Sequence, residues 1–143
     1  MLATLLLVVS ENIYRDATST LRGGIDLTDA RIQSQRLLQL LTDAQAAQFG
    51  FLVTGQPDYL TQHARAKAEL PAVQAVVSRF LVSQGSEGAA VAQRVADFVA
   101  HEFVLFDRTL ALARSGQTAA ANELASRDQG RIGMLSLRRE LVE

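Results

Sequence analysis

The chain carries LLQLLTDAQAAQFGFLVTGQPDYL at residues 37–60, an apolar helical stripe followed by a helix stop and a new start. Apolar side chains before the stop recur at steps of three and four residues, which is the spacing of one helix face and not of a strand. Gly55 suits the end of a helix because glycine readily adopts the left-handed conformation, and Pro57 suits the first turn of the next helix. The stretch therefore predicts two helices joined by a tight reversal at residues 54–58.

Similar breaker residues at 23–24, 83–88 and 115–117 divide the chain further. They leave an N-terminal segment, residues 1–24, and four helical stretches within residues 25–143. Pro71 interrupts the second stretch, where we expect a bend and not a break because the apolar pattern continues on both sides. Helices of about 27 residues would be roughly 40 Å long, and short loops force neighbours to be antiparallel. We therefore predict an all-α fold, an antiparallel up-down-up-down four-helix bundle whose two ends lie at the same pole.

The expected core follows from the apolar stripes of these four stretches. Each stripe keeps the three- and four-residue spacing of one helix face. The members are Leu27, Ala30, Ser34, Leu37, Leu38, Leu41, Ala44, Gln48, Phe51 and Leu52; Tyr59, Leu60, His63, Ala66, Leu70, Val73, Val76, Val77, Phe80 and Leu81; Val91, Val95, Phe98, Val99, Glu102, Phe103, Phe106, Leu110 and Ala113; and Ala120, Leu124, Ile132, Leu135 and Leu141.

Composition excludes several classes of protein. A chain of 143 residues fits one domain with its own core, and a formal net charge of −1 offers no basic footprint for a nucleic-acid backbone. No cysteine is present, which rules out disulfides and thiolate metal sites but leaves the compartment open. We expect no nucleic-acid partner.

The first ten residues, MLATLLLVVS, form an apolar run before a polar segment. Spanning a bilayer takes about 20 apolar residues, so this run is too short to cross one. It also lacks the basic start and the small-residue cleavage site of a secretory signal. We interpret it as the outer end of a truncated transmembrane helix, and residues 1–24 as a membrane-proximal segment. An apolar first turn of a soluble helix and a remnant of recombinant expression are the alternatives.

Catalytic signatures are missing from the sequence, which contains no phosphate-binding glycine loop, nucleophile elbow, zinc-binding helix or paired carboxylates of di-iron type. We assign no catalytic residue, no metal ligand and no cofactor. His63 and His101 are expected on different helices in structural or solvent-facing positions, since a metal needs three or four converging ligands. Asp107 and Arg108 are interpreted as part of a solvated helix face.

Two glutamines on the first stripe are the most informative polar positions. Gln45 and Gln48 flank the stripe just before Phe51, where leucine would pack better. A buried amide costs stability unless it is hydrogen-bonded. One interpretation is a polar contact at a ligand-binding or dimer-facing pole; the other is a boundary glutamine that lies partly in water.

The run from Leu41 to Leu60 resembles the signature of a known sensory family, the third type of cyclase/histidine-kinase-associated sensory extracellular domain. That pattern is approximately D-A-E-T-G-Q-R-G-Y-L-L-T-G, a short spacer, then Y-L. The later segment 119–137, with Gly130 followed by Met134, resembles the closing helix of the same family. The positions that match in order and spacing are Asp43, Ala44, Gln48, Gly50, Leu52, Thr54, Gly55, Tyr59 and Leu60.

The resemblance implies which residues form the framework and which are candidates for a ligand or for signalling. Asp43 and the helix stop, turn and start at Gly50, Thr54, Gly55 and Leu60 would be structural. The signalling candidates are Gln45, Gln48, Phe49 and Tyr59. Two of them depart from the pattern, since Gln45 replaces a common glutamate and Phe49 replaces an arginine. If the glutamate and the arginine form an ion pair in relatives, replacing only one of them would leave an unpaired charge, whereas replacing both is tolerable.

The resemblance also implies a function for the domain. It would be the periplasmic or extracellular sensor of a bacterial inner-membrane receptor, most commonly a histidine kinase, with a cyclase or a chemoreceptor as further outputs. Flanking transmembrane helices, cytoplasmic modules, an unidentified small-molecule ligand and a homodimeric partner would accompany it. A soluble helical adaptor is the main alternative, because amphipathic stripes alone would explain it. A metal-dependent bundle enzyme is the weakest, since the predicted interior is poor in carboxylates.

Overall fold

The chain folds into helices throughout the part that the computed structural model describes, residues 2–127 and 129–142, with side chains for residues 27–127 and 133–141. The expected all-α class is confirmed, and the described residues contain no strand. The elements are α1 (Leu2–Thr54), α2 (Pro57–Ser83), α3 (Ser86–Arg114), α4 (Thr118–Ser126) and α5 (Gln129–Val142).

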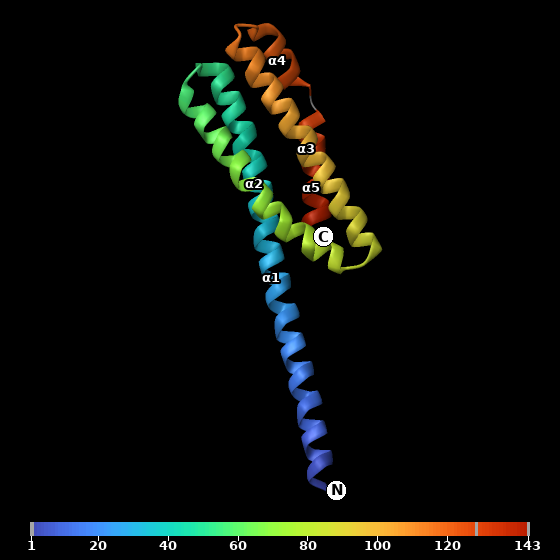
Figure 1. Cartoon of the computed structure of the whole chain (residues 1–143). Coiled ribbons are helices and arrows are strands. Elements are labelled where there is room, and N and C mark those ends of the chain that lie inside the picture. Colours follow the sequence, from blue (N-terminus) through green and yellow to red (C-terminus); the bar gives the residue numbers. More distant parts are fainter. Residues whose placement is uncertain (1, 128, 143) are drawn as a thin grey trace.

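The helices are arranged around a bundle from which α1 projects (Figure 1). α2 returns along α1 and then diverges toward the start of α3, α3 runs back up, and α5 descends beside α3. We call the end with the α1–α2 turn and α4 the upper end, and the end where α1 leaves the bundle the lower end. The end of α5 and the exit of α1 both lie at the lower end (Figure 1).

Two boundaries differ from the expectation. α1 continues through Gly23 and Gly24, where a break was expected. Glycine lowers helix propensity by about 1 kcal/mol relative to alanine but permits helical geometry, so a pair of glycines need not end a helix. The last stretch, expected as one helix, forms α4 and α5 because Arg127 adopts an extended conformation with φ −65° and ψ 110°. α2 runs through Pro71 without a break, as expected.

The core follows the expected stripes on the first three helices, except that Leu27 is 43% exposed. Leu37, Leu41 and Val77 are almost completely buried, and thirteen buried apolar residues form one cluster across α1, α2, α3 and α5. The expectation fails in part on the last stretch, where Leu135 is 60% exposed and Leu137 is buried at 4%. Leu141 packs against the core as expected, together with Met134 and Leu137, and the expected Ile132 lies outside the residues whose side chains are described.

The α1–α2 turn has the predicted form. Gly55 takes φ +68° and its N–H donates to the Phe51 carbonyl at 2.8 Å, which ends α1 with a left-handed cap. The Thr54 hydroxyl donates to the Gly50 carbonyl at 2.7 Å and accepts from the Gln56 N–H at 3.2 Å. Pro57 opens α2. These hydrogen bonds are consistent with the structural role expected for Thr54 and Gly55.

Close contacts hold α1 and the first half of α2 together. A Cβ added at Gly50 would lie 2.3 Å from Cε1 of Tyr59, so the absence of a side chain lets the tyrosine ring pack on the α1 backbone. Further down, Arg36 donates to both carboxylate oxygens of Glu69 at 2.6 and 2.7 Å. The Arg36 hydrogen bonds lower the pKa of Glu69.

None of the helices, as far as the described residues go, contains a stretch long and apolar enough to cross a membrane.

Candidate functional site

A groove of about 430 Å³ opens at the upper end of the bundle between α1, α3 and the end of α4. Its volume falls within the range of small-molecule sites, roughly 300–1,000 Å³. α1 and α3 contribute the long walls, and the last turn of α4 closes one side. The lining residues are Thr42, Gln45, Ala46, Gln48, Phe49, Glu102, Leu105, Phe106, Thr109, Leu124, Ala125, Ser126 and Arg127.

The structure brings three of the four ligand candidates to this groove. Gln45, Gln48 and Phe49 line it from one face of α1, because residues three and four apart lie on the same side of a helix. Tyr59 does not line it and packs instead on Gly50. Tyr59 is therefore part of the α1–α2 turn, beside the residues expected to be structural.

Asp43 and Leu60, the remaining residues expected to be structural, lie outside the groove. Asp43 is exposed and accepts a hydrogen bond from the Gln39 amide at 2.7 Å within α1. Leu60 is partly buried on the first turns of α2. Only Leu60 contributes to packing, whereas Asp43 sits on the helix surface.

The interior side of the groove is polar, and we call Gln48, Glu102 and Thr109 the polar floor. Their exposed fractions are 3%, 3% and 0%. Gln48 is thus buried, and the interpretation as a boundary glutamine partly in water is wrong. Glu102 and Thr109 lie on one face of α3 with Phe106 between them, at helical spacing.

None of the three floor side chains makes a hydrogen bond or an ion pair with another described residue. The Thr109 hydroxyl is buried and makes no hydrogen bond in the described part of the chain. Glu102 is 3% exposed, but its carboxylate oxygens are not among the fully enclosed atoms without a partner, unlike Thr109 Oγ1. Burial raises the pKa of Glu102, and the nearby charge of His101 offsets only part of that rise. Unpaired buried polar groups cost stability, so their gathering at a groove calls for a functional reason.

The sequence indicates only part of this floor. Glu102 appears as a carboxylate inside the apolar stripe of the third stretch, which is a usable signal, because charged residues are almost never fully buried unless paired. Thr109 carries no such signal, since a threonine among leucines and alanines reads as an ordinary helix position. The convergence of Gln48 with residues of α3 depends on helix packing, which local spacing does not specify.

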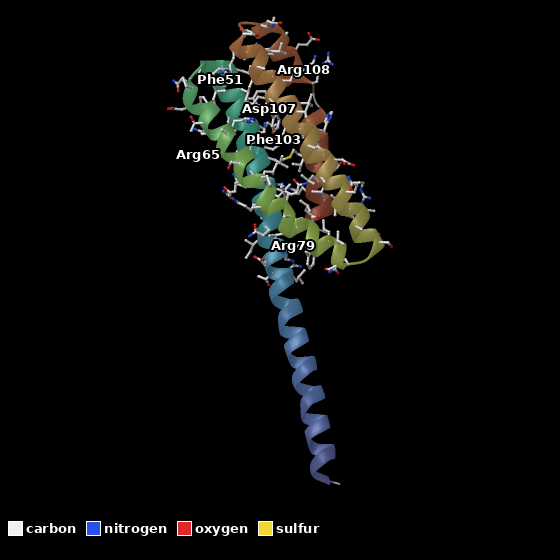
Figure 2. The ribbon with its side chains drawn as sticks, viewed as in Figure 1. Phe51, Arg65, Arg79, Phe103, Asp107 and Arg108 are labelled. Atoms are coloured by element: carbon white, nitrogen blue, oxygen red, sulfur yellow. The ribbon has the colours of Figure 1, made fainter. Side chains whose placement is uncertain are left out.

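A second polar cluster joins α2 to α3 beside the floor. His63 is 5% exposed, packs against the rings of Phe103 and Phe106 at centroid distances of 5.6 and 6.1 Å, and places Nε2 3.1 Å from Oδ1 of Asp107. The Lys67 ammonium donates to the other oxygen of Asp107. In Figure 2, Phe103 and Asp107 lie on the side of α3 that faces the neighbouring helices.

These contacts change the interpretation of two sequence positions. Asp107 is not simply part of a solvated face, because it ties α3 to two residues of α2. Burial acts to raise the pKa of Asp107, but the hydrogen bonds from Lys67 and His63 outweigh it, and the pKa is lowered. His63 takes a structural position within the core, one of the two expected alternatives, and His101 is exposed on α3.

A family model described as the CHASE3 domain matches residues 25–143, most of the chain and all the elements that build the groove. The chain belongs to the CHASE3 family. CHASE3 is a sensory domain of signalling receptors and is not catalytic. Comparisons with curated proteins and with solved structures found no match.

Proposed function

We propose that this CHASE3 domain is the extracytoplasmic sensor of a bacterial transmembrane receptor, with a histidine kinase as its output and a homodimer as its working form. Family membership supports the sensory role. The observation that carries the proposal further is the continuity of α1. This helix supplies one wall of the groove and runs unbroken to Leu2, well beyond the lower end of the bundle (Figure 1).

The projecting part of α1 suits the transfer of small displacements. Residues 2–26 would extend roughly 37 Å at 1.5 Å per residue. A single helix moves as a unit, and receptors of several kinds signal through helix shifts of about 1–2 Å. α1 contacts α2, α3, α4 and α5, so repacking at any of these helices bears on its position.

The last two helices together would complete a four-helix arrangement. α5 descends beside α3 and contacts α1, and α4 contacts the same two helices at the upper end (Figure 1). We propose that α4 and α5 act as one interrupted fourth helix in an up-down-up-down bundle. The extended backbone at Arg127 would let α4 adjust at the groove while α5 stays packed on the core.

Rotational coupling through α1 provides a direct test. Residues 1–143 would replace the sensor between the two membrane spans of a histidine kinase that drives a reporter gene. One alanine inserted after Gly24 turns the lower part of α1 by about 100° relative to the bundle, whereas seven alanines add roughly two turns and nearly restore its phase. We expect the single insertion to change basal reporter output and the seven-residue insertion to return it toward the original level.

An output that does not depend on the insertions would contradict the sensor proposal. If both insertions leave the output at the level of the uninterrupted chimera, α1 does not carry a signal and the soluble adaptor becomes the better assignment. Immunoblotting of membrane fractions would verify equal amounts of each chimera.

A further inference from the structure

The polar floor offers hydrogen-bond acceptors from three side chains. Gln48 contributes an amide oxygen, Glu102 a carboxylate and Thr109 a hydroxyl oxygen, all buried and all lining the groove. A primary ammonium group carries three N–H donors and no acceptor. The number and the kind of partners on the floor therefore match those that an ammonium group needs.

Charge favours the same kind of ligand. When Glu102 is ionised, it is the one charged group among the described lining residues of α1 and α3. Arg127 supplies a cation at the rim, but its side chain is 68% exposed and is already paired with Glu123 at 3.3 Å. His101 influences Glu102 from an exposed position on α3. A ligand that brings a positive charge to the floor would neutralise the buried carboxylate where the protein does not.

The side chains in the walls of the groove indicate the chemical character of the rest of the ligand. Apolar side chains from all three contributing elements surround the polar floor, namely Ala46, Phe49, Leu105, Phe106, Leu124 and Ala125. The partly exposed ring of Phe49 can also receive a cation over its face. Phe49 is 43% exposed, which leaves an apolar surface at the mouth of the groove for a ligand to cover.

We propose that the groove binds a small organic cation, a primary amine with a compact apolar body, whose ammonium group pairs with Glu102 and hydrogen-bonds to Gln48 and Thr109. The apolar body lies against Phe49, Leu105 and Phe106. This inference rests on the proposed sensor function and names the ligand class of that sensor. Binding joins α1 to α3 across the groove, and α1 is the helix that leaves the bundle.

The test uses the whole 143-residue chain and isothermal titration calorimetry with phenethylammonium chloride. Phenethyl alcohol has the same body without the charge, and hydrocinnamate has a similar body with the opposite charge. We expect the ammonium compound to bind at least about tenfold more tightly than the alcohol. Hydrocinnamate should give no measurable binding, because it would place two carboxylates on the same floor.

Glu102→Gln isolates the carboxylate, since glutamine keeps the shape and removes the charge. We expect the affinity for phenethylammonium to fall by about thirtyfold or more, as for loss of one partner of a buried ion pair. Asp97→Asn is the matched control, because Asp97 is an exposed carboxylate on the same helix whose single hydrogen bond to a described residue is with Gln93. Its affinity should equal that of the original chain.

The affinity should also depend on pH in a defined direction. Binding needs the ionised carboxylate, so it should weaken as pH falls through the raised pKa of Glu102. Among the described residues, Arg127 at the end of α4 lines the groove, His101 on α3 acts on Glu102 from an exposed position, and α1 presents uncharged Thr42, Gln45 and Gln48. Toward α2, His63 and Lys67 are paired with Asp107. A His101→Asn variant that keeps the pH dependence would assign it to Glu102.

Equal binding of the alcohol and the ammonium compound, or unchanged affinity in Glu102→Gln, would overturn the ligand assignment. Neither result would touch the sensor proposal, because the insertion chimeras report coupling through α1 without any ligand. Conversely, phase-independent output in those chimeras would refute the sensor proposal and leave a measured amine site intact.

Discussion

The lower and upper halves of the bundle interior differ in the polarity of their buried side chains. In the lower half, described side chains from α1, α2, α3 and α5 fill the core with hydrocarbon, and Ser34 is the polar exception. In the upper half, four polar side chains are buried among the apolar ones: Gln48, His63, Glu102 and Thr109. The comparison indicates that the lower half provides the stability of the domain, while the upper half gives up some of that stability to hold a polar site.

The largest change in stability should appear when a buried residue of the lower half is truncated. Leu37 is completely buried, and Leu37→Ala should reduce the free energy of unfolding by about 3 kcal/mol through lost transfer energy and a residual cavity. Urea denaturation followed by circular dichroism measures the loss. Ile32→Ala, at a position on the same helix that is 55% exposed, should change stability by less than about 0.5 kcal/mol. Equal losses at the two positions would contradict the assignment of the core.

The α1–α2 turn should give the next largest effect. In Gly50→Ala the new methyl group must displace the Tyr59 ring, so we expect a loss of about 2 kcal/mol. Removing the ring in Tyr59→Ala should relieve the clash, and the double variant should be more stable than the sum of the single losses predicts. Urea unfolding of all four chains completes the cycle. Strict additivity would mean that Gly50 acts on helix propensity alone.

Substitution in the polar floor should raise the free energy of unfolding, whereas substitution in the core lowers it. Glu102→Gln should raise the free energy of unfolding by about 1 kcal/mol at neutral pH, because it removes a buried charge without a partner. The pKa of Glu102 is raised in the folded chain, so its favourable contribution is complete at low pH and is lost as pH rises through that pKa. The gain from Glu102→Gln should therefore shrink as pH falls. A gain that is independent of pH would point to packing and not to charge.

The cluster at Asp107 should show the smallest effect and the reverse sign. Asp107→Asn removes the ion pair with Lys67, and because the side chain is 43% exposed we expect a loss of only about 0.5 kcal/mol. The pKa of Asp107 is lowered in the folded chain, so its contribution is present above the ordinary aspartate pKa and is lost as pH falls through the lowered value. The loss should disappear in acid, as thermal melts across pH would show. Asp97→Asn serves as the control again.

Local spacing in the sequence predicted the parts of this fold that local chemistry determines. The core faces of the first three helices follow from residues three and four apart, and the α1–α2 turn follows from the conformations that Gly55 and Pro57 allow. The continuous helix at Gly23 and Gly24 was missed because glycine weakens a helix without ending it. The interruption at Arg127 was missed because arginine is not a breaker.

The candidate site was predicted in part for the same reason. Gln45, Gln48 and Phe49 lie within one stretch of α1, and their polar and aromatic character was visible against the stripe. Their meeting with Glu102 and Thr109 depends on how α3 packs against α1, and the bond between His63 and Asp107 depends on how α3 packs against α2. Such contacts between distant segments have no signature in the spacing of a single sequence.

The contrast between a stabilising lower half and a ligand-binding upper half can be tested in one measurement, thermal unfolding of the original chain and of Glu102→Gln with and without phenethylammonium chloride. A ligand that binds only the folded state raises the melting temperature. We predict that Glu102→Gln melts higher than the original chain without ligand and gains little from the ammonium compound, whereas the original chain gains several degrees. A lower melting temperature for Glu102→Gln, or an equal gain for both chains, would contradict the role assigned to the polar floor.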